Sequence, residues 1–264
     1  MLQKIDFSKK KLGKEEYKAE YDQLVSRLAV LQAQAVAKGV GMVVLFEGWS
    51  GAGKGSRISD LLYHMDARAT SVHVTEDVDV EDCQKVRKAS RNVDGFHPFT
   101  QEFWEALGPR SNITFFNQGW YSKMGQNLFF NPPYDSVESF VNPESASKAR
   151  AKQEESLQQA VESFESQITA DGYILKMFFL HISQETQETR LRKLAADPST
   201  AWRVDAADLR EINIYDKLYD IYDNMLEVTN FEFAPWVVVN GEDKRAVNLR
   251  VIQEIVSAFE EALA

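Results

Sequence analysis

Cysteine is almost absent from this 264-residue chain, since Cys83 is the only one and no disulfide can form within it. A single thiol fits a reducing compartment, and we expect a cytoplasmic location. Long apolar runs are also missing: no stretch approaches the roughly 18 apolar residues of a membrane-spanning helix. The charged first 18 residues contain no apolar core of the kind that signal peptides have. We therefore expect no contact with a membrane.

Positive charge is scarce as well. Lys and Arg number 30 against 40 Asp and Glu, which gives a formal net charge of −10. Proteins that bind nucleic acid in general carry a basic surface, so this balance argues against nucleic acid as a partner. A small polyanionic substrate would need a local basic patch that works against the overall field. The rest of the composition, 44% hydrophobic and 27% charged, is typical of a globular protein with a sizeable core.

Apolar runs alternate with amphipathic patterns along the whole chain. These patterns predict five helices. The first covers residues 15–38 and ends at Gly39, and the second follows the first strand. The third begins near Pro143, the fourth begins after Asp205 as its N-cap, and the last covers 248–263. This alternation predicts an α/β fold of three layers, in which helices cover both faces of a parallel sheet. The five runs typical of buried parallel strands are residues 42–47, 70–76, 112–117, 173–183 and 235–241.

The segment GWSGAGKGS, residues 48–56, lies between the first strand and the next helix and matches the P-loop (Walker A) pattern G-x-x-x-x-G-K. Glycines let backbone N–H groups approach phosphate oxygens, the helix start adds a positive dipole, and Lys54 adds a charge. The alternative is a glycine-rich turn that binds nothing. Gly55 stands where the usual motif has a magnesium-holding Ser or Thr. The candidate phosphate-binding residues are Gly48, Gly51, Gly53, Lys54, Gly55, Ser56 and Arg57.

Four segments beyond the loop carry patterns of their own: LLYHMDARATSVH (61–73), HPFTQEFWEALGPRSNITFF (97–116) with the WY that follows, LHIS…ADPSTAWRV…DL…YD (180–216), and APWVVVNGEDKRAVNLRVI (234–252). Together with the loop, and in this order, they resemble the polyphosphate kinase 2 family, whose members pass phosphoryl groups between inorganic polyphosphate and nucleotides with magnesium. The resemblance covers residues 15–262. It implies a P-loop kinase-like fold with strand order 2-3-1-4-5, a single domain over 1–264 with a helical lid at about 184–212, and inorganic polyphosphate, an adenine nucleotide and Mg²⁺ as ligands.

Two departures from the family pattern fall on the chemistry. Ser50 stands where the family loop has Asp, and Asn117 and Gln118 stand where the third strand of the family ends in Asp-Arg. Mg²⁺ prefers carboxylate and phosphate oxygens, and phosphoryl transfer depends on positioning and electrostatics. We therefore expect Lys54 to be what remains of the catalytic set and Mg²⁺ binding to be weakened or absent. The activity of this chain is open.

The same departures resemble the first of the two fused domains in polyphosphate:AMP phosphotransferases. The resemblance implies either fusion to a second, similar domain or a free-standing homo-oligomer. Other charged residues could line the site. Glu47, with Glu76, Asp77 and Asp79, is an alternative metal site or else a solvated acidic loop. The basic candidates for polyphosphate contacts are Arg68, Arg110, Arg190 and Arg203, together with Arg87, Lys88, Arg91, Arg192 and Lys193.

Three functions are open at this point. The first is a polyphosphate-dependent nucleotide phosphotransferase that acts on AMP or ADP. The second is a non-catalytic phosphate-binding or oligomerising module of the same fold. The third is another P-loop small-molecule kinase, which the DP-x₃-W pattern at 197–202 and the APWVVV strand disfavour. Thermal shifts with polyphosphate, combined with an assay for ADP and ATP, separate the first two functions.

Overall fold

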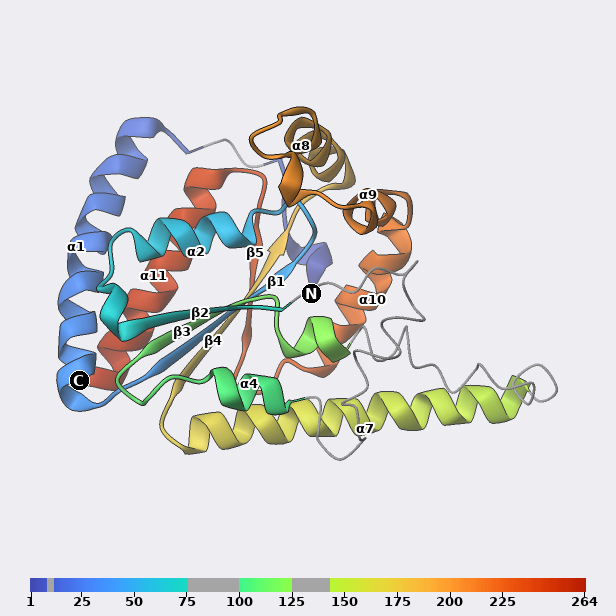
Figure 1. Ribbon diagram of the computed structural model, residues 1–264, viewed down its shortest axis with the longest axis horizontal. Coiled ribbons are helices and arrows are strands. Elements are labelled where there is room, and N and C mark those ends of the chain that lie inside the picture. The colour runs from blue at the N-terminus through green and yellow to red at the C-terminus, as the bar shows by residue number, and fades with distance from the viewer. Residues whose placement is uncertain (9–11, 76–99, 125–142) are drawn as a thin grey trace.

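The computed structural model describes residues 1–8, 12–75, 100–124 and 143–264 (Figure 1). A five-stranded parallel sheet with the order β2-β3-β1-β4-β5 forms its centre. Both the predicted α/β class and the predicted strand order are confirmed. Each predicted run corresponds to one strand. The strands are β1 (Met42–Gly48), β2 (Thr70–Val74), β3 (Ile113–Asn117), β4 (Ile174–His181) and β5 (Trp236–Asn240).

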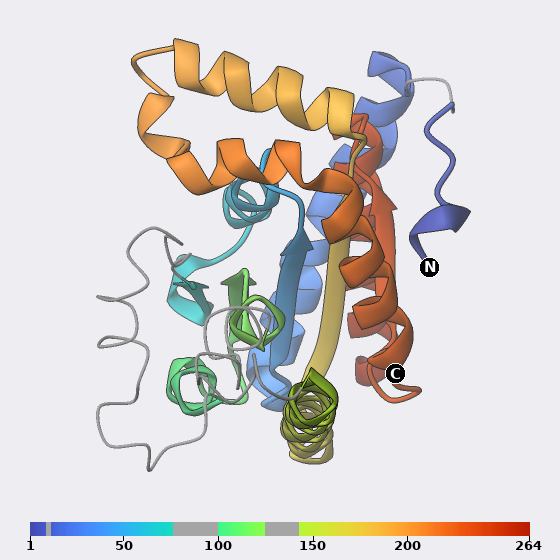
Figure 2. The ribbon, with the colours of Figure 1, turned by 90° about the vertical axis from the view of Figure 1, so that its right-hand side faces the viewer.

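Helices cover both faces of this sheet (Figures 1 and 2). On one face α1 packs along α11, and α11 lies against β4, β5 and α2. The other face is covered by α4, α7 and α10: Phe103 of α4 meets Phe116 of β3, Tyr222 of α10 meets Phe179 of β4, and α7 lies against β4. No described helix is long and apolar enough to cross a membrane. The helices are α1 (Lys14–Lys38), α2 (Lys54–Leu62), α4 (Gln101–Ala106), α7 (Pro143–Ala170), α8 (Gln184–Ala196), α9 (Ala206–Asn213), α10 (Tyr215–Val228) and α11 (Lys244–Leu263), with short 3-10 turns at η1 (Leu2–Lys4), η2 (Ala67–Ala69) and η4 (Ala201–Arg203).

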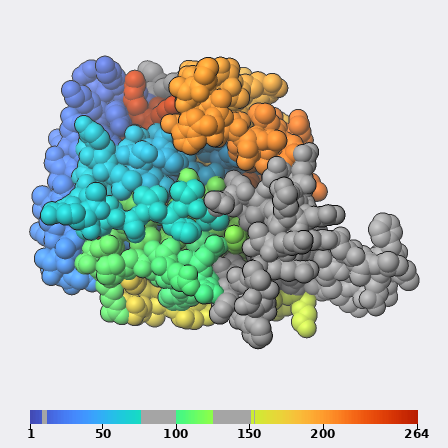
Figure 3. Space-filling view, in the orientation of Figure 1, coloured from blue at the N-terminus to red at the C-terminus, as the bar shows by residue number. Residues whose placement is uncertain are grey.

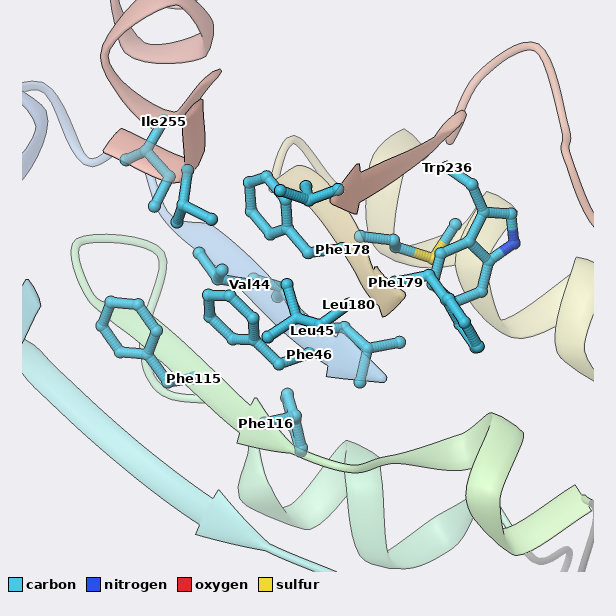
Figure 4. Packing of buried hydrophobic residues seen from close by; sticks show 14 of the residues in the cluster. Val44, Leu45, Phe46, Phe115, Phe116, Phe178, Phe179, Leu180, Trp236 and Ile255 are labelled. Carbon is cyan, nitrogen blue, oxygen red and sulfur yellow. The ribbon is translucent and has the colours of Figure 1, made fainter. Parts of the chain in front are cut away.

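The central strand β1 is buried along its whole length, because helices cover both of its faces. Its side chains alternate between the two layers. Phe46 stacks on Phe178 of β4, with ring centroids 5.2 Å apart, and Ile255 of α11 lies on the side of Val44 and Phe178 (Figure 4). Each such side chain contributes roughly 1.5–3 kcal/mol on burial. The apolar run that predicts this strand therefore also holds the phosphate-loop candidate in place.

One predicted helix is wrong in its extent. The pattern that follows Asp205 predicts a single helix, but the structure has α9 and α10, with a break at Ile214 (φ −117°, ψ 19°). Asp205 does cap α9, through a capping box with Asp208. The break places the Tyr215 ring against Trp49 of the loop that follows β1. The Tyr215 hydroxyl donates to the Ile182 carbonyl, which follows β4, at 2.6 Å. The spacing of apolar residues along the sequence gives no sign of tertiary contacts of this kind.

Candidate phosphate-binding site

The loop that connects β1 to α2 lies at the carboxyl edge of the sheet, where ligand sites of α/β proteins form. Gly48 has φ of 122°, and a Cβ there would lie 2.4 Å from the Leu180 carbonyl oxygen of the neighbouring strand. Gly53, which precedes α2, has φ of 96°. Both positions require glycine, the first because of contact and conformation, the second because of conformation alone.

Several backbone donors face outward at the start of α2. The first helical bond runs from the N–H of Arg57 to the carbonyl of Gly53 at 3.1 Å. The N–H groups of Lys54, Gly55 and Ser56 have no acceptor among the described residues, as expected for the first turn of a helix. Gly55 and Ser56 are exposed. These donors and the helix dipole form a ready place for an anion.

Lys54 lies folded over the loop. Its Nζ donates to the carbonyl oxygens of Gly48 at 2.6 Å and Trp49 at 3.3 Å. The ammonium group is therefore held at the first two residues of the loop segment. A lysine in this position places a positive charge where phosphate oxygens would arrive.

Trp49 anchors the loop in the core of the protein. Its side chain is fully buried, and its ring stacks on that of Tyr215 at 4.0 Å. Its indole N–H donates to Nδ1 of His181 at 2.9 Å. Burial lowers the pKa of His181 to about 4, so the ring stays neutral and Nδ1 can accept. The loop is thus held rigidly against β4 and α10.

The Glu211 carboxylate of α9 contacts Ser50 on the side of the loop that faces α8 and α9, which is the outer side of the loop. Oε1 of Glu211 accepts from the N–H of Ser50 at 3.1 Å, and Oε2 accepts from the Ser50 hydroxyl at 2.7 Å. Gln187 of α8 donates to Oε1 at 2.9 Å. Burial raises the pKa of Glu211, while the nearby Lys54 acts in the opposite direction. The α8 and α9 side chains lie next to those of α2 on the molecular surface (Figure 3).

Asn117 and Gln118, at the end of β3, adjoin the loop. Nδ2 of Asn117 lies 3.6 Å from the position of a Cβ on Gly55, so the amide faces the start of α2. Its Oδ1 is buried and has no hydrogen-bond partner in the part of the chain that the structure describes. Gln118 adopts a positive φ of 60°, and its N–H donates to the Phe46 carbonyl at 2.9 Å. The Asn117 amide therefore lies next to the first turn of α2.

Glu47, the alternative metal ligand on β1, is hydrogen-bonded to the segment that follows β3. It is only 4% exposed, and burial raises its pKa. Oε1 accepts from the N–H groups of Gly119 at 2.9 Å and Ser122 at 3.1 Å, and Oε2 accepts from the Ser122 hydroxyl at 2.7 Å. Both oxygens therefore hold the helical turn at 120–124, so Glu47 does not fit a metal site.

The described residues that surround the loop fit Mg²⁺ poorly. Among residues 1–8, 12–75, 100–124 and 143–264, no three acidic, His or Cys side chains gather as a metal-binding group. Asn117 offers a neutral oxygen, and the oxygens of Glu47 and Glu211 are already engaged. Mg²⁺ prefers carboxylate and phosphate oxygens. Glu76, Asp77 and Asp79 lie outside the described residues.

Three of the basic candidates pair with residues away from the loop. Arg57 is buried, and its guanidinium binds Asp60 at 3.0 Å and the Lys244 carbonyl at 3.2 Å, between α2 and α11. Arg68 and Arg110 precede β2 and β3, so they lie at the amino edge of the parallel sheet, opposite the loop. Their partners are Asp66 and Asp171, respectively. Proximity to a strand in sequence does not say which edge a residue reaches.

Arg190 of α8 is the basic candidate that the structure brings to the loop. Its guanidinium donates to the carbonyl oxygens of Gly51 at 3.4 Å, Gly241 at 2.8 Å and Glu242 at 2.9 Å. Arg203 instead lies over the exposed Trp202 ring, 5.1 Å from its centroid. Arg192 pairs with Glu188 at 2.7 Å. Arg87, Lys88, Arg91 and Cys83 lie outside the described residues.

The Trp-Tyr pair after β3 surrounds a buried acid that the sequence pattern misses. Oε1 of Glu165, on α7, accepts from the Trp120 indole and the Tyr121 hydroxyl, both at 2.7 Å. Burial raises the pKa of Glu165 to about 8. Trp120 and Trp236 are buried, whereas Trp104 is 38% exposed and packs edge-on against Phe164 of α7. No short-range signal links Glu165 to residues more than 40 positions earlier.

The polyphosphate kinase 2 family model matches residues 11–264 of this chain. The chain belongs to the polyphosphate kinase 2 family. A polyphosphate:AMP phosphotransferase of Pseudomonas aeruginosa is 27% identical to it over 263 residues, which cover 98% of this chain and 47% of that protein. The chain thus spans about half the length of this relative. ADP-polyphosphate phosphotransferase 1 of Rhizobium meliloti is 26% identical, with 96% and 75% coverage.

The crystal structure of polyphosphate kinase 2 from Arthrobacter aurescens TC1 superposes with a TM-score of 0.78 over 99% of this chain and 86% of that one. At 23% identity this likeness shows the polyphosphate kinase 2 fold. The family acts in polyphosphate-dependent phosphoryl transfer to and from nucleotides. Its members generally use Mg²⁺.

Proposed function

We propose that this polyphosphate kinase 2 family member binds polyphosphate at its loop and transfers phosphoryl groups to nucleotides poorly or not at all. The observation that carries the proposal is the composition of the loop surroundings. Anion-binding parts are in place: the N–H groups of Lys54, Gly55 and Ser56, the Lys54 ammonium and the α2 dipole. Ser50, Asn117 and Gln118 supply no charge at the positions where the family pattern has Asp, Asp and Arg.

The missing charges bear on transfer more than on binding. Phosphoryl transfer relies on charges that neutralise the transferring group, and loss of one such donor can reduce the rate by about 10²–10³. Binding of an anion needs mainly the N–H groups and Lys54, which remain. Arg190 adds a guanidinium beside Gly51. We therefore expect binding to persist after catalysis is lost.

The proposed ligands are inorganic polyphosphate and an adenine nucleotide, with Mg²⁺ bound weakly. We assign residues 184–212, which comprise α8, η4 and most of α9, as the lid of one domain that spans 1–264. The contacts of Glu211, Gln187 and Arg190 with the loop support this assignment. Polyphosphate:AMP transfer in the Pseudomonas aeruginosa relative makes AMP the first nucleotide to try. Cytoplasmic location, and a partner that is a second copy or a fused domain, remain part of the proposal.

The experiment compares binding and turnover in matched variants. Calorimetry with tripolyphosphate should show binding to the unmodified chain and at least a tenfold weaker Kd in Lys54→Ala, since a charge-assisted contact is lost. The triple variant Ser50→Asp/Asn117→Asp/Gln118→Arg should gain turnover of AMP with polyphosphate and Mg²⁺. Equal affinity of the unmodified chain and Lys54→Ala would contradict the loop as the binding site.

The second candidate is a wholly non-catalytic module of the same fold. The contact between Ser50 and Glu211 favours it, because a carboxylate occupies the outer side of the loop. A triple variant that binds tripolyphosphate as the unmodified chain does, yet shows no turnover, is the result expected from this candidate.

A further inference from the structure

Glu211 behaves as a bound anion within the protein. Its carboxylate receives three hydrogen bonds: the N–H and hydroxyl of Ser50 and the side-chain amide of Gln187. A carboxylate that leaves water needs such donors to offset the cost of burial. The donor from the backbone belongs to the same loop whose other N–H groups face outward.

We propose that Glu211 is a built-in competitor that polyphosphate must displace from the outer side of the loop. This inference rests on the proposed function, because it takes the loop as the place where phosphate binds. A phosphate group beside Ser50 would face the Glu211 carboxylate at close range, and two negative charges in a partly buried site repel strongly. Entry of the ligand therefore requires Glu211 to move away.

The contacts of the neighbouring residues show what such a movement would release. Glu211 lies on α9, near the break at Ile214 that separates α9 from α10. Ser50 is 161 positions away in sequence, so this contact joins the lid directly to the loop. Leu191 of α8 also packs on Gly51, 3.3 Å from the position of a Cβ there. Loss of the Glu211 contacts should free α9 while the contacts of Leu191 and Arg190 with Gly51 stay in place.

The competitor determines how tightly the loop holds anions. Glu211→Gln keeps the size and an oxygen acceptor for the Ser50 N–H but removes the negative charge. We expect its Kd for tripolyphosphate to be about tenfold lower than that of the unmodified chain, the change typical of one charge-assisted contact. Glu185→Gln is the matched control. It removes a charge from the exposed first turn of α8, and its Kd should stay within about twofold.

Calorimetry with tripolyphosphate gives the first readout and amide hydrogen exchange the second. In the unmodified chain, tripolyphosphate should speed exchange in residues 206–213. Glu211→Gln loses the charge that strengthens the bonds from the Ser50 hydroxyl and from Gln187. In this variant, exchange in residues 206–213 should already be faster without ligand than in the unmodified chain, while exchange in β1 and β4 stays slow, which shows that the variant is folded. Both results together support the competitor.

The results that would contradict the competitor differ from those that would contradict the proposed function. Measurable binding with equal affinity in the unmodified chain and Glu211→Gln would overturn the competitor and leave the proposed function standing. So would unchanged exchange in α9 of the variant. Absence of tripolyphosphate binding in both proteins at millimolar concentration would overturn the proposed function, and the competitor with it.

Discussion

Replacement of Glu165 by glutamine should raise the stability of the protein at neutral and alkaline pH and leave it unchanged in acid. Glu165 is fully buried, and burial raises its pKa from 4.5 to about 8. Between these values the unfolded chain releases the proton and the folded protein keeps it. A pKa that is raised in the folded state means that stability is present below pH 4.5 and is lost as the pH rises toward 8.

The size of the effect follows from this interval. Each pH unit above 4.5 contributes about 1.4 kcal/mol, so the penalty reaches about 3 kcal/mol at pH 7 and about 5 kcal/mol near pH 8. Glutamine preserves the acceptor for the Trp120 indole and the Tyr121 hydroxyl. It cannot ionise, so the variant avoids the penalty.

Urea unfolding followed by tryptophan fluorescence, from pH 5 to 8.5, measures the difference between the two proteins. Other titrating groups change both proteins alike and cancel in the difference. Glu162→Gln, at an exposed position of the same helix, is the control and should show no trend with pH. A difference that stays constant with pH, or a glutamine variant that is less stable at pH 8, would refute the reasoning.

Three further variants test the loop and its support. Gly48→Ala should destabilise the protein by about 2–4 kcal/mol, because its Cβ would lie 2.4 Å from the Leu180 carbonyl oxygen. The Cβ of Gly53→Ala meets open space, so this variant should lose only about 1 kcal/mol of stability, from its backbone conformation. Equal losses of stability in urea unfolding would contradict the contact with Leu180. His181, whose pKa falls from 6.5 to about 4 on burial, should make the protein lose up to about 3 kcal/mol as the pH falls from 6.5 to 4. His181→Gln should flatten this decline, and an unchanged decline would contradict a neutral His181.

Local patterns predict the parts of this fold that local physics decides. The apolar run at 42–47 forms β1, Gly39 ends α1 in the left-handed conformation, and Asp205 caps α9. The loop follows from its glycines and Lys54. These features depend on residues within a few positions of each other.

Long-range contacts decide the rest. Glu211 meets Ser50 across 161 positions, and Glu47 turns toward Ser122 rather than the loop. Arg68 and Arg110 reach the edge of the sheet opposite to the expected one. The break at Ile214 comes with the packing of Tyr215 on Trp49. None of these pairings has a short-range signature, so one sequence does not reveal them.

The turnover of the unmodified chain with AMP, polyphosphate and millimolar Mg²⁺ tests the central claim most directly. A coupled assay for ADP and ATP should detect no product, or a rate far below about 1 s⁻¹, the low end for kinases, under conditions in which tripolyphosphate binding is saturated. A rate near about 1 s⁻¹ would contradict the account. It would show that Ser50, Asn117 and Gln118 do not limit transfer.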